Sequence, residues 1–211
     1  MALGKYIVIE GNDGTGKSTQ VEAIRKRLRQ AGIESIEFHE PAGVPIADAI
    51  RNIIKDGSLE RDGETNLLLF TAARHEIWKR AEKELAEGKW VVAARNYYST
   101  LAYQGYGEGL SLDLITNTMR TFTDDRYLNP DLAVILNIND KVRKERITQR
   151  GALATPDTFE ARNSEFQTNV NNGYLAIAQK YGLGVVDAGQ SVQVVTDEIW
   201  DLVKRTFQLD M

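Results

Sequence analysis

The feature that most constrains this chain is the stretch GNDGTGKS at residues 11–18. It fits the pattern G-x-x-x-x-G-K-[ST] at Gly11, Gly16, Lys17 and Ser18. The stretch follows an apolar run (5–11) and opens an amphipathic segment (18–32), which is the strand–loop–helix setting of a phosphate-binding loop. A glycine-rich turn with a chance lysine would lack this matched setting. The loop therefore predicts a binding site for a nucleoside triphosphate.

Each part of such a loop has a physical role. Glycines let backbone N–H groups turn inward around phosphate oxygens, and the helix N-terminus adds positive charge. We expect Lys17 to reach the β and γ phosphates and the Ser18 hydroxyl to hold Mg²⁺ together with phosphates and waters. The other loop residues expected at this ATP site are Asn12, Asp13, Gly14, Thr15 and Thr19.

Apolar runs alternate with amphipathic segments along the rest of the chain. The expected strands are 5–11, 34–40, 89–94, 131–138 and 184–188. The expected helices are 18–32, 45–57, 63–87, 111–122, 140–150, a long helix ending at Tyr181, and 191–207. In the first helix, Val21, Ile24 and Leu28 share one face; in the second, we expect Ile46, Ile50, Ile53 and Ile54 to point inward.

Strands that are apolar on both faces and separated by helices predict a parallel sheet covered on both sides. The expected fold is a P-loop NTPase three-layer α/β sandwich with five parallel strands and helices on both faces. Without an internal repeat, low-complexity tract or linker, residues 1–211 are expected to form one domain.

Composition narrows the class of protein. The net charge of -4 and the pI of about 5.4 do not indicate a nucleic-acid or membrane partner, so neither is expected. There are no cysteines and only two histidines, so disulfides, thiolate sites and multi-histidine metal sites are not expected. The first residues lack the apolar core of a signal peptide, which favours a cytoplasmic protein.

Three further stretches are expected to surround the loop: FHEPAG (38–43), LLLFTAARHE (67–76) and ARNYYSTLAYQG (94–105). Phe70 and Arg74 are four residues apart on an expected helix and therefore share a face. An aromatic plane beside a guanidinium suits a nucleobase, because stacking alone contributes about 1–3 kcal/mol. A core phenylalanine beside a surface arginine would show the same spacing, so periodicity leaves both readings open.

Taken with YIVIEGNDGTGKSTQ, NPDLAVILNI and QRGALATPDTFE, these stretches resemble the thymidylate kinase family, in order and across essentially the whole chain. The P-loop is generic, whereas the combination of E-P-x-G, F-x-A-x-R, R-x-x-x-S-x-x-A-Y-Q-G and P-D-L is specific. The resemblance implies transfer of the γ-phosphoryl group of ATP to dTMP with Mg²⁺, and it also implies a homodimer.

The resemblance implies a role for each matching residue. Phe70 would stack on thymine, Arg74 would hydrogen-bond its edge, and Arg95 would hold the dTMP phosphate. The sugar and base pocket would be lined by Ser99, Tyr103 and Gln104. Asp13 would accept a hydrogen bond from the sugar 3′-OH. The same residues also fit plainer roles, since an aspartate is tolerated in a turn and a tyrosine suits a core.

Near the expected lid, at about 150–160, Arg146 is similar to the family arginine that packs on adenine, and Arg150, Asp157 and Glu160 flank the loop. Solvent-exposed helix charges would look the same. Some family members carry a catalytic arginine in the P-loop and others in the lid. Thr15 rules out the first arrangement, and the loop 151–157 has no arginine, which leaves Arg150 or Arg146. With Lys17, Arg95 and Asp13, Arg150 completes the expected catalytic set.

One position departs from the family. The family has Asp-Arg-Tyr or Asp-Arg-His where this chain has Ala94, Arg95 and Asn96. That aspartate helps to hold Mg²⁺, so Ser18, phosphates, waters and Glu10 are the groups left for the metal. Two alternatives to an ordinary dTMP kinase therefore stay open. One is a kinase for another deoxynucleoside monophosphate, such as dUMP or a broader set; the other is a weakly active or non-catalytic nucleotide-binding relative.

Overall fold

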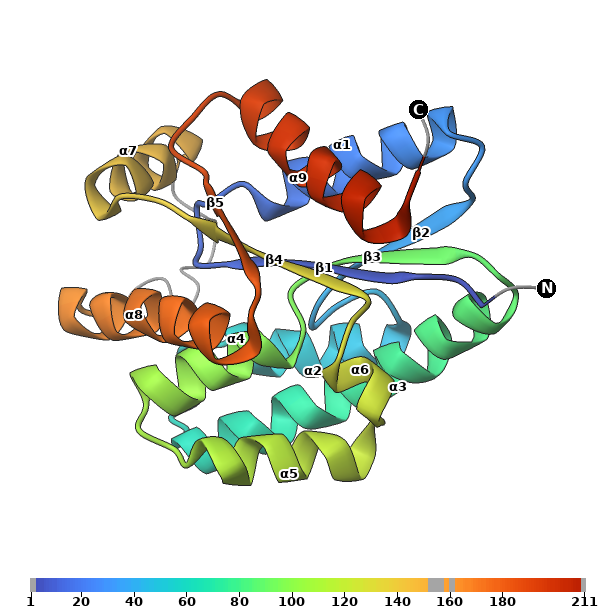
Figure 1. The fold of residues 1–211 in the computed structure, drawn as a ribbon. Helices are drawn as coiled ribbons and strands as arrows, with labels where there is room; N and C mark the ends of the chain where they lie inside the picture. Colours follow the sequence, from blue (N-terminus) through green and yellow to red (C-terminus); the bar gives the residue numbers. More distant parts are fainter. Residues whose placement is uncertain (1–2, 152–157, 160–161, 210–211) are drawn as a thin grey trace.

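The computed structural model describes residues 3–151, 158–159 and 162–209. Its centre is a sheet of five parallel strands in the order β2-β3-β1-β4-β5 (Figure 1). The strands are β1 (Tyr6–Gly11), β2 (Ser35–His39), β3 (Trp90–Ala94), β4 (Leu132–Asn137) and β5 (Gly184–Asp187). The predicted five-stranded parallel sheet is confirmed, and the P-loop follows its central strand.

Helices cover both faces of this sheet. Figure 1 shows α1 (Lys17–Gln30), α7 (Asp140–Arg150) and α9 (Val192–Phe207) on one side. The other side carries α2 (Pro45–Lys55), α3 (Gly63–Ala86), α4 (Tyr97–Thr100), α5 (Leu112–Phe122), α6 (Asp125–Leu128) and α8 (Ser164–Tyr181). The alternation of β1 produces the two layers: Ile7 and Ile9 pack toward α1 and α9, whereas Tyr6 and Val8 pack toward the other layer. Among the described residues, no helix combines the length and apolar composition that a membrane span requires.

The inward face of α2 is narrower than the sequence predicts. Ala47 and Ile54 are buried, but Ile46 and Ile53 are 53% and 45% exposed, so the prediction was wrong for these two side chains. The reason is tertiary. Because α2 packs mainly on α3, only one stripe of the helix finds apolar partners.

The segment after β3 is helical, which the sequence did not reveal. α4 runs directly into a π-helix, η1 (Leu101–Gly107), and π-helical turns often mark functional sites. Gly105 and Gly107 suggest a turn in the sequence, but in the structure they allow the helix to pack closely against its neighbours. A Cβ on Gly105 would lie 2.5 Å from the Leu112 side chain, and one on Gly107 would lie 2.5 Å from the Phe166 ring. η1 therefore packs closely against α5 and α8.

Candidate active site

A cavity of about 530 Å³ opens at the carboxyl ends of the strands, where parallel sheets bind ligands. Its walls come from the P-loop, the tips of β2 and β3, and the helices α2, α3, η1 and α7. The lining residues are Asp13, Gly14, Gly16, Lys17, Ser18, Thr19, His39, Glu40, Pro41, Arg51, Ile54, Lys55, Phe70, Arg74, Ala94, Arg95, Ser99, Tyr103, Gln104, Arg146, Ile147 and Phe159.

Most of the residues predicted for the site therefore meet in one place. Gly11, Asn12 and Thr15 do not line the cavity. Arg150 ends α7, but its side chain lies outside the described part of the structure, as do Asp157, Glu160 and the lid residues 152–157. The structure thus brings the P-loop and the residues around Phe70 and Arg74 to one cavity, and the lid stays a prediction.

The P-loop is held in shape by its own side chains and by α8. Lys17 Nζ donates to the carbonyl oxygen of Asn12 at 2.8 Å, and Thr15 Oγ1 donates to the same oxygen at 2.9 Å. The buried Asn12 amide donates to Gln167 Oε1 at 3.2 Å and to Asn171 Oδ1 at 2.8 Å. Asn12 therefore anchors the loop to α8, a role that its place in the motif does not suggest.

The tip of β3 is organised by the fully buried carboxylate of Glu10. Oε1 accepts hydrogen bonds from the backbone N–H groups of Asn96 (2.8 Å) and Ser99 (3.0 Å). Oε2 accepts from Ser99 Oγ (2.8 Å), Tyr174 Oη (3.1 Å) and the N–H of Gly11 (3.2 Å). Glu10 continues the β1 face of Tyr6 and Val8 and does not line the cavity, so a part for it in holding Mg²⁺ stays a prediction.

This turn gives Arg95 its unusual backbone. Its φ of 75° lies in the left-handed region, which costs a non-glycine residue about 1–2 kcal/mol. The guanidinium turns toward the P-loop, where Nη2 donates to Asp13 Oδ1 at 2.5 Å, and Nη1 donates to Ser99 Oγ at 3.0 Å and Tyr174 Oη at 3.1 Å. Strain of this kind is found where function requires a fixed geometry.

Asp13 lies between the two halves of the cavity. Tyr103 Oη donates to its Oδ2 at 3.0 Å, while Arg95 holds its Oδ1. Burial opposes ionisation of Asp13, but the charges of Arg95 and Lys17 outweigh it and hold the pKa of Asp13 well below its usual range. Asp13 is therefore an ionised hydrogen-bond acceptor at neutral pH.

Phe70 and Arg74 form the other end of the cavity. The Arg74 guanidinium lies 5.1 Å from the centroid of the Phe70 ring, and its Nε donates to Glu40 Oε2 at 3.0 Å. Arg74 is buried and also donates to Thr100 Oγ1. Burial raises the pKa of Glu40 to about 7, against the lowering influence of Arg74 and Tyr127. A flat apolar ring beside a rigidly held guanidinium is the arrangement that a planar base requires.

The two remaining polar residues predicted for this pocket, Gln104 and Ser99, form hydrogen bonds with neighbouring side chains. Gln104, on η1, donates from Nε2 to Glu108 Oε2 at 3.1 Å. Ser99 is bound to Glu10 and Arg95, so its hydroxyl supports the arginine as much as it lines the cavity. On α7, Arg146 Nη2 donates to the carbonyl oxygen of Gln190 at 3.4 Å, next to the P-loop.

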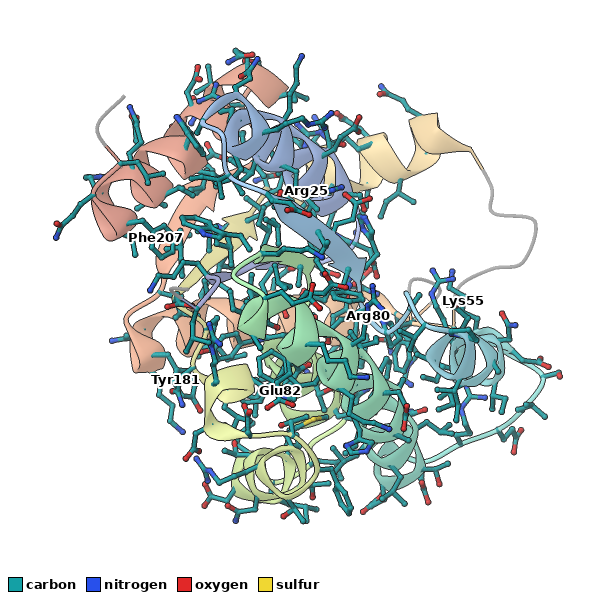
Figure 2. The ribbon with its side chains drawn as sticks, turned by 90° about the vertical axis from the view of Figure 1, so that its right-hand side faces the viewer. Arg25, Lys55, Arg80, Glu82, Tyr181 and Phe207 are labelled. Carbon is teal, nitrogen blue, oxygen red and sulfur yellow. The ribbon has the colours of Figure 1, made fainter. Side chains whose placement is uncertain are left out.

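Several residues of the site were not predicted from the sequence. Arg51 and Lys55 are four apart on α2 and face the cavity, and a basic pair on an otherwise apolar helix face is the signal that could have found Arg51. Figure 2 shows Lys55 at the end of α2. Phe159 in the lining, and Tyr174, which contacts Arg95 from outside the lining, carry no local signal, because they come from parts of the chain far from their partners.

The charges of the cavity favour a polyanion. Six basic side chains line it, against the carboxylates of Asp13 and Glu40: Lys17, Arg51, Lys55, Arg74, Arg95 and Arg146. The described residues hold no cluster of three or more His, Cys, Asp or Glu side chains that could bind a metal by itself. A divalent cation here would depend on Ser18 and on oxygens of the bound phosphates, and hard oxygen ligands of this kind suit Mg²⁺.

Comparison with known proteins gives a consistent result. The family model for thymidylate kinase matches residues 9–199. A thymidylate kinase of Rhodopseudomonas palustris (strain TIE-1) is 35% identical over 206 residues, which cover 95% of this chain and 89% of the relative. The thymidylate kinase of Colwellia psychrerythraea is 36% identical over 94% of this chain and 93% of its own length. That of Thermomicrobium roseum is 37% identical over 96% of each.

The Glu10 network yields a first prediction. In Glu10→Gln an amide NH₂ replaces one of the two carboxylate oxygens. Because the NH₂ group cannot accept hydrogen bonds, the buried N–H and O–H groups around it lose their acceptor. Chemical denaturation at pH 7 should show the free energy of unfolding reduced by about 2–4 kcal/mol. The exposed carboxylate of Glu22 on α1 provides the control, and Glu22→Gln should match wild type. Equal stability of the two variants would contradict the role given to Glu10.

Proposed function

Since the chain belongs to the thymidylate kinase family and is an ATP-dependent dTMP kinase, we propose how its cavity carries out the reaction. ATP binds on the P-loop side, dTMP binds between η1 and α3, and the two meet at Arg95 and Asp13. The observation that carries this assignment is the fixed Arg95 guanidinium, which lies beside the P-loop and at the edge of the base pocket.

The donor half follows from the P-loop. Backbone N–H groups at the start of α1 face the phosphates, and Lys17 neutralises the β and γ phosphates. Ser18 follows Lys17 in the first turn of α1 and lines the cavity, so its hydroxyl fits a magnesium ligand. Mg²⁺, when bound with ATP, neutralises charge on the donor phosphates. Arg146, which lies on α7 and donates to Gln190 in the loop after β5, packs on the adenine.

The acceptor half holds dTMP at three points. Phe70 stacks on the thymine and Arg74 hydrogen-bonds its edge, while Arg95 holds the phosphate. Ser99, Tyr103 and Gln104 complete the wall from η1 and its start. Asp13, ionised and held by Tyr103 and Arg95, accepts a hydrogen bond from the sugar 3′-OH. Arg51 faces the same half and adds a second guanidinium for the acceptor phosphate.

This arrangement supports direct in-line transfer. The phosphate of dTMP is already ionised at neutral pH, so no strong general base is needed, and catalysis depends on positioning and on charge neutralisation. Arg95 draws the acceptor anion toward the donor despite their like charges, and Lys17 stabilises the donor. The lid arginine that stabilises the transferring group is Arg150 or Arg146.

Base discrimination follows from the same contacts. A site that hydrogen-bonds a base edge rejects a wrong donor and acceptor pattern by about 10⁴–10⁵, whereas one methyl group contributes only about 1–3 kcal/mol. Purines and cytosine should therefore be excluded more firmly than dUMP, which differs from dTMP by the methyl group alone.

The role of Arg95 has a direct kinetic test. Arg95→Ala should raise the KM for dTMP about 10- to 100-fold, because charge-assisted hydrogen bonds to the acceptor phosphate are lost. The dissociation constant for ADP, measured by calorimetry, should change less than about two-fold. Arg120→Ala, at an exposed position on α5, is the matched control and should resemble wild type. An equal loss in both measurements would refute the assignment of Arg95 to the acceptor.

We further propose that the enzyme acts in the cytoplasm as a homodimer. Exposed apolar side chains lie on α2, α3 and α5, and α3 packs against both of the other helices: Ile46, Ile53, Leu68, Leu114 and Phe122. Leu68, in α3, is 63% exposed. Large apolar side chains exposed together are typical of interaction surfaces, and a second copy of the chain offers the same surface in return.

The dimer proposal predicts an effect of charge at Leu68. Leu68→Glu should convert a dimer into a monomer in light scattering, because a buried unpaired carboxylate opposes association. Val192→Glu is the control, since Val192 is 57% exposed but lies on α9, on the opposite side of the sheet. A wild-type monomer, or a Leu68→Glu dimer as tight as wild type, would contradict the proposed surface.

A further inference from the structure

The position where the resemblance expects an aspartate is occupied by Ala94, and the residue that pairs with Ala94 across the sheet is His39. His39 is the last residue of β2 and lines the cavity together with Lys17 and Ser18. A polar side chain therefore stands next to the missing carboxylate, on the neighbouring strand. The P-loop signature does not include it, and the family resemblance gave it no role.

His39 reaches the P-loop because a helix face and a strand face meet there. Ser18 and Arg25 are seven residues apart on α1, which is two turns, so they share a face. Glu37 and His39 are two residues apart on β2 and also share a face. α1 packs on β2, which places Ser18 opposite His39 and Arg25 opposite Glu37. Figure 2 shows Arg25 on α1 beside the sheet.

The contacts form a chain that ends at Ser18. Arg25 Nη1 lies 2.6 Å from Glu37 Oε2, and Arg25 Nη2 also donates to the carbonyl oxygen of Ser35 at 2.9 Å, so Glu37 is fixed. Glu37 Oε1 lies 3.9 Å from His39 Nε2. His39 Nδ1 lies 3.3 Å from Ser18 Oγ. A carboxylate beside Nε2 favours the proton on that nitrogen, which leaves Nδ1 as an acceptor for the Ser18 hydroxyl.

We propose that His39 is the positioning residue of the magnesium–nucleotide site, where its Nδ1 accepts a hydrogen bond from the Ser18 hydroxyl and thereby aims the oxygen lone pairs into the cavity. The proposal rests on the proposed function, in which Ser18 binds the metal. Partners that orient a metal ligand increase its affinity by reducing its freedom. His39 thereby supplies, from β2, part of the order that an aspartate at position 94 would supply from β3.

The test measures magnesium dependence of nucleotide binding rather than turnover. ADP binding is titrated by calorimetry at a series of Mg²⁺ concentrations and in EDTA. His39→Ala should raise the half-saturating Mg²⁺ concentration about five-fold and leave ADP binding in EDTA unchanged. His39→Asn should stay within about two-fold of wild type, because the amide oxygen of asparagine can stand where Nδ1 stands.

The second histidine gives a matched control. His75 has the same side-chain exposure, 42%, but lies on α3, where its Nδ1 contacts the carbonyl oxygen of Phe122 outside the cavity. His75→Ala should show the wild-type magnesium dependence. Adding Ala94→Asp to His39→Ala should restore the half-saturating concentration, because the new carboxylate stands beside the vacated position.

The outcomes separate the two proposals. A wild-type protein that phosphorylates dTMP, together with a His39→Ala variant whose half-saturating Mg²⁺ concentration equals that of wild type, would overturn the role of His39 alone. Loss of ADP binding in EDTA would also overturn it, because the effect would then act on the nucleotide rather than on the metal. A wild-type protein that binds ADP without any effect of Mg²⁺ and leaves dTMP unchanged would instead overturn the proposed function.

Discussion

The carboxylate of Glu10 is the constraint on which the rest of the site depends. It lies at the end of the central strand with no exposure to solvent, and it accepts from Gly11 N, Asn96 N, Ser99 N, Ser99 Oγ and Tyr174 Oη. A buried charge is tolerated only when its hydrogen bonds are satisfied, so those donors must converge. One carboxylate thereby joins β1, the turn after β3 and α8.

This convergence explains how an arginine at the tip of β3 reaches the P-loop. With the N–H groups of Asn96 and Ser99 held by Glu10, the chain must leave β3 sharply, and Arg95 takes up a positive φ. Its guanidinium then lies beside Asp13 of the P-loop instead of pointing into solvent. The strain at Arg95 is offset by the buried network, which fixes the guanidinium between Asp13 and the Tyr103 ring.

The sequence predicted the parts of this site that depend on local patterns. The P-loop, the five strands and the shared face of Phe70 and Arg74 follow from spacing, and the structure brings them to one cavity. The network behind them does not follow from spacing. Tyr174 meets Glu10 from 164 residues away, and Asn12 meets Asn171 from 159 residues away. No local period encodes contacts of that range.

Other features were missed for related reasons. The π-helix η1 was hidden because its glycines are also turn residues, and close packing against α5 and α8 requires them. Ile46 and Ile53 were assigned inward because the period of α2 allows a wide apolar face, whereas its contact with α3 uses a narrow one. In the sequence, His39 is only one of two histidines, too few for a multi-histidine metal site. Its pairing with Ala94 appears only when β2 is placed beside β3, and its contact with Ser18 appears only when α1 packs on β2.

The most direct test of this account is the formation of ADP by the wild-type protein with ATP and Mg²⁺ across dTMP, dUMP, dCMP, dGMP and dAMP. The geometry predicts the highest kcat/KM for dTMP, a lower value for dUMP and little turnover of the others. Turnover of dGMP without turnover of dTMP would contradict the account, and so would ATP binding without phosphorylation of any acceptor.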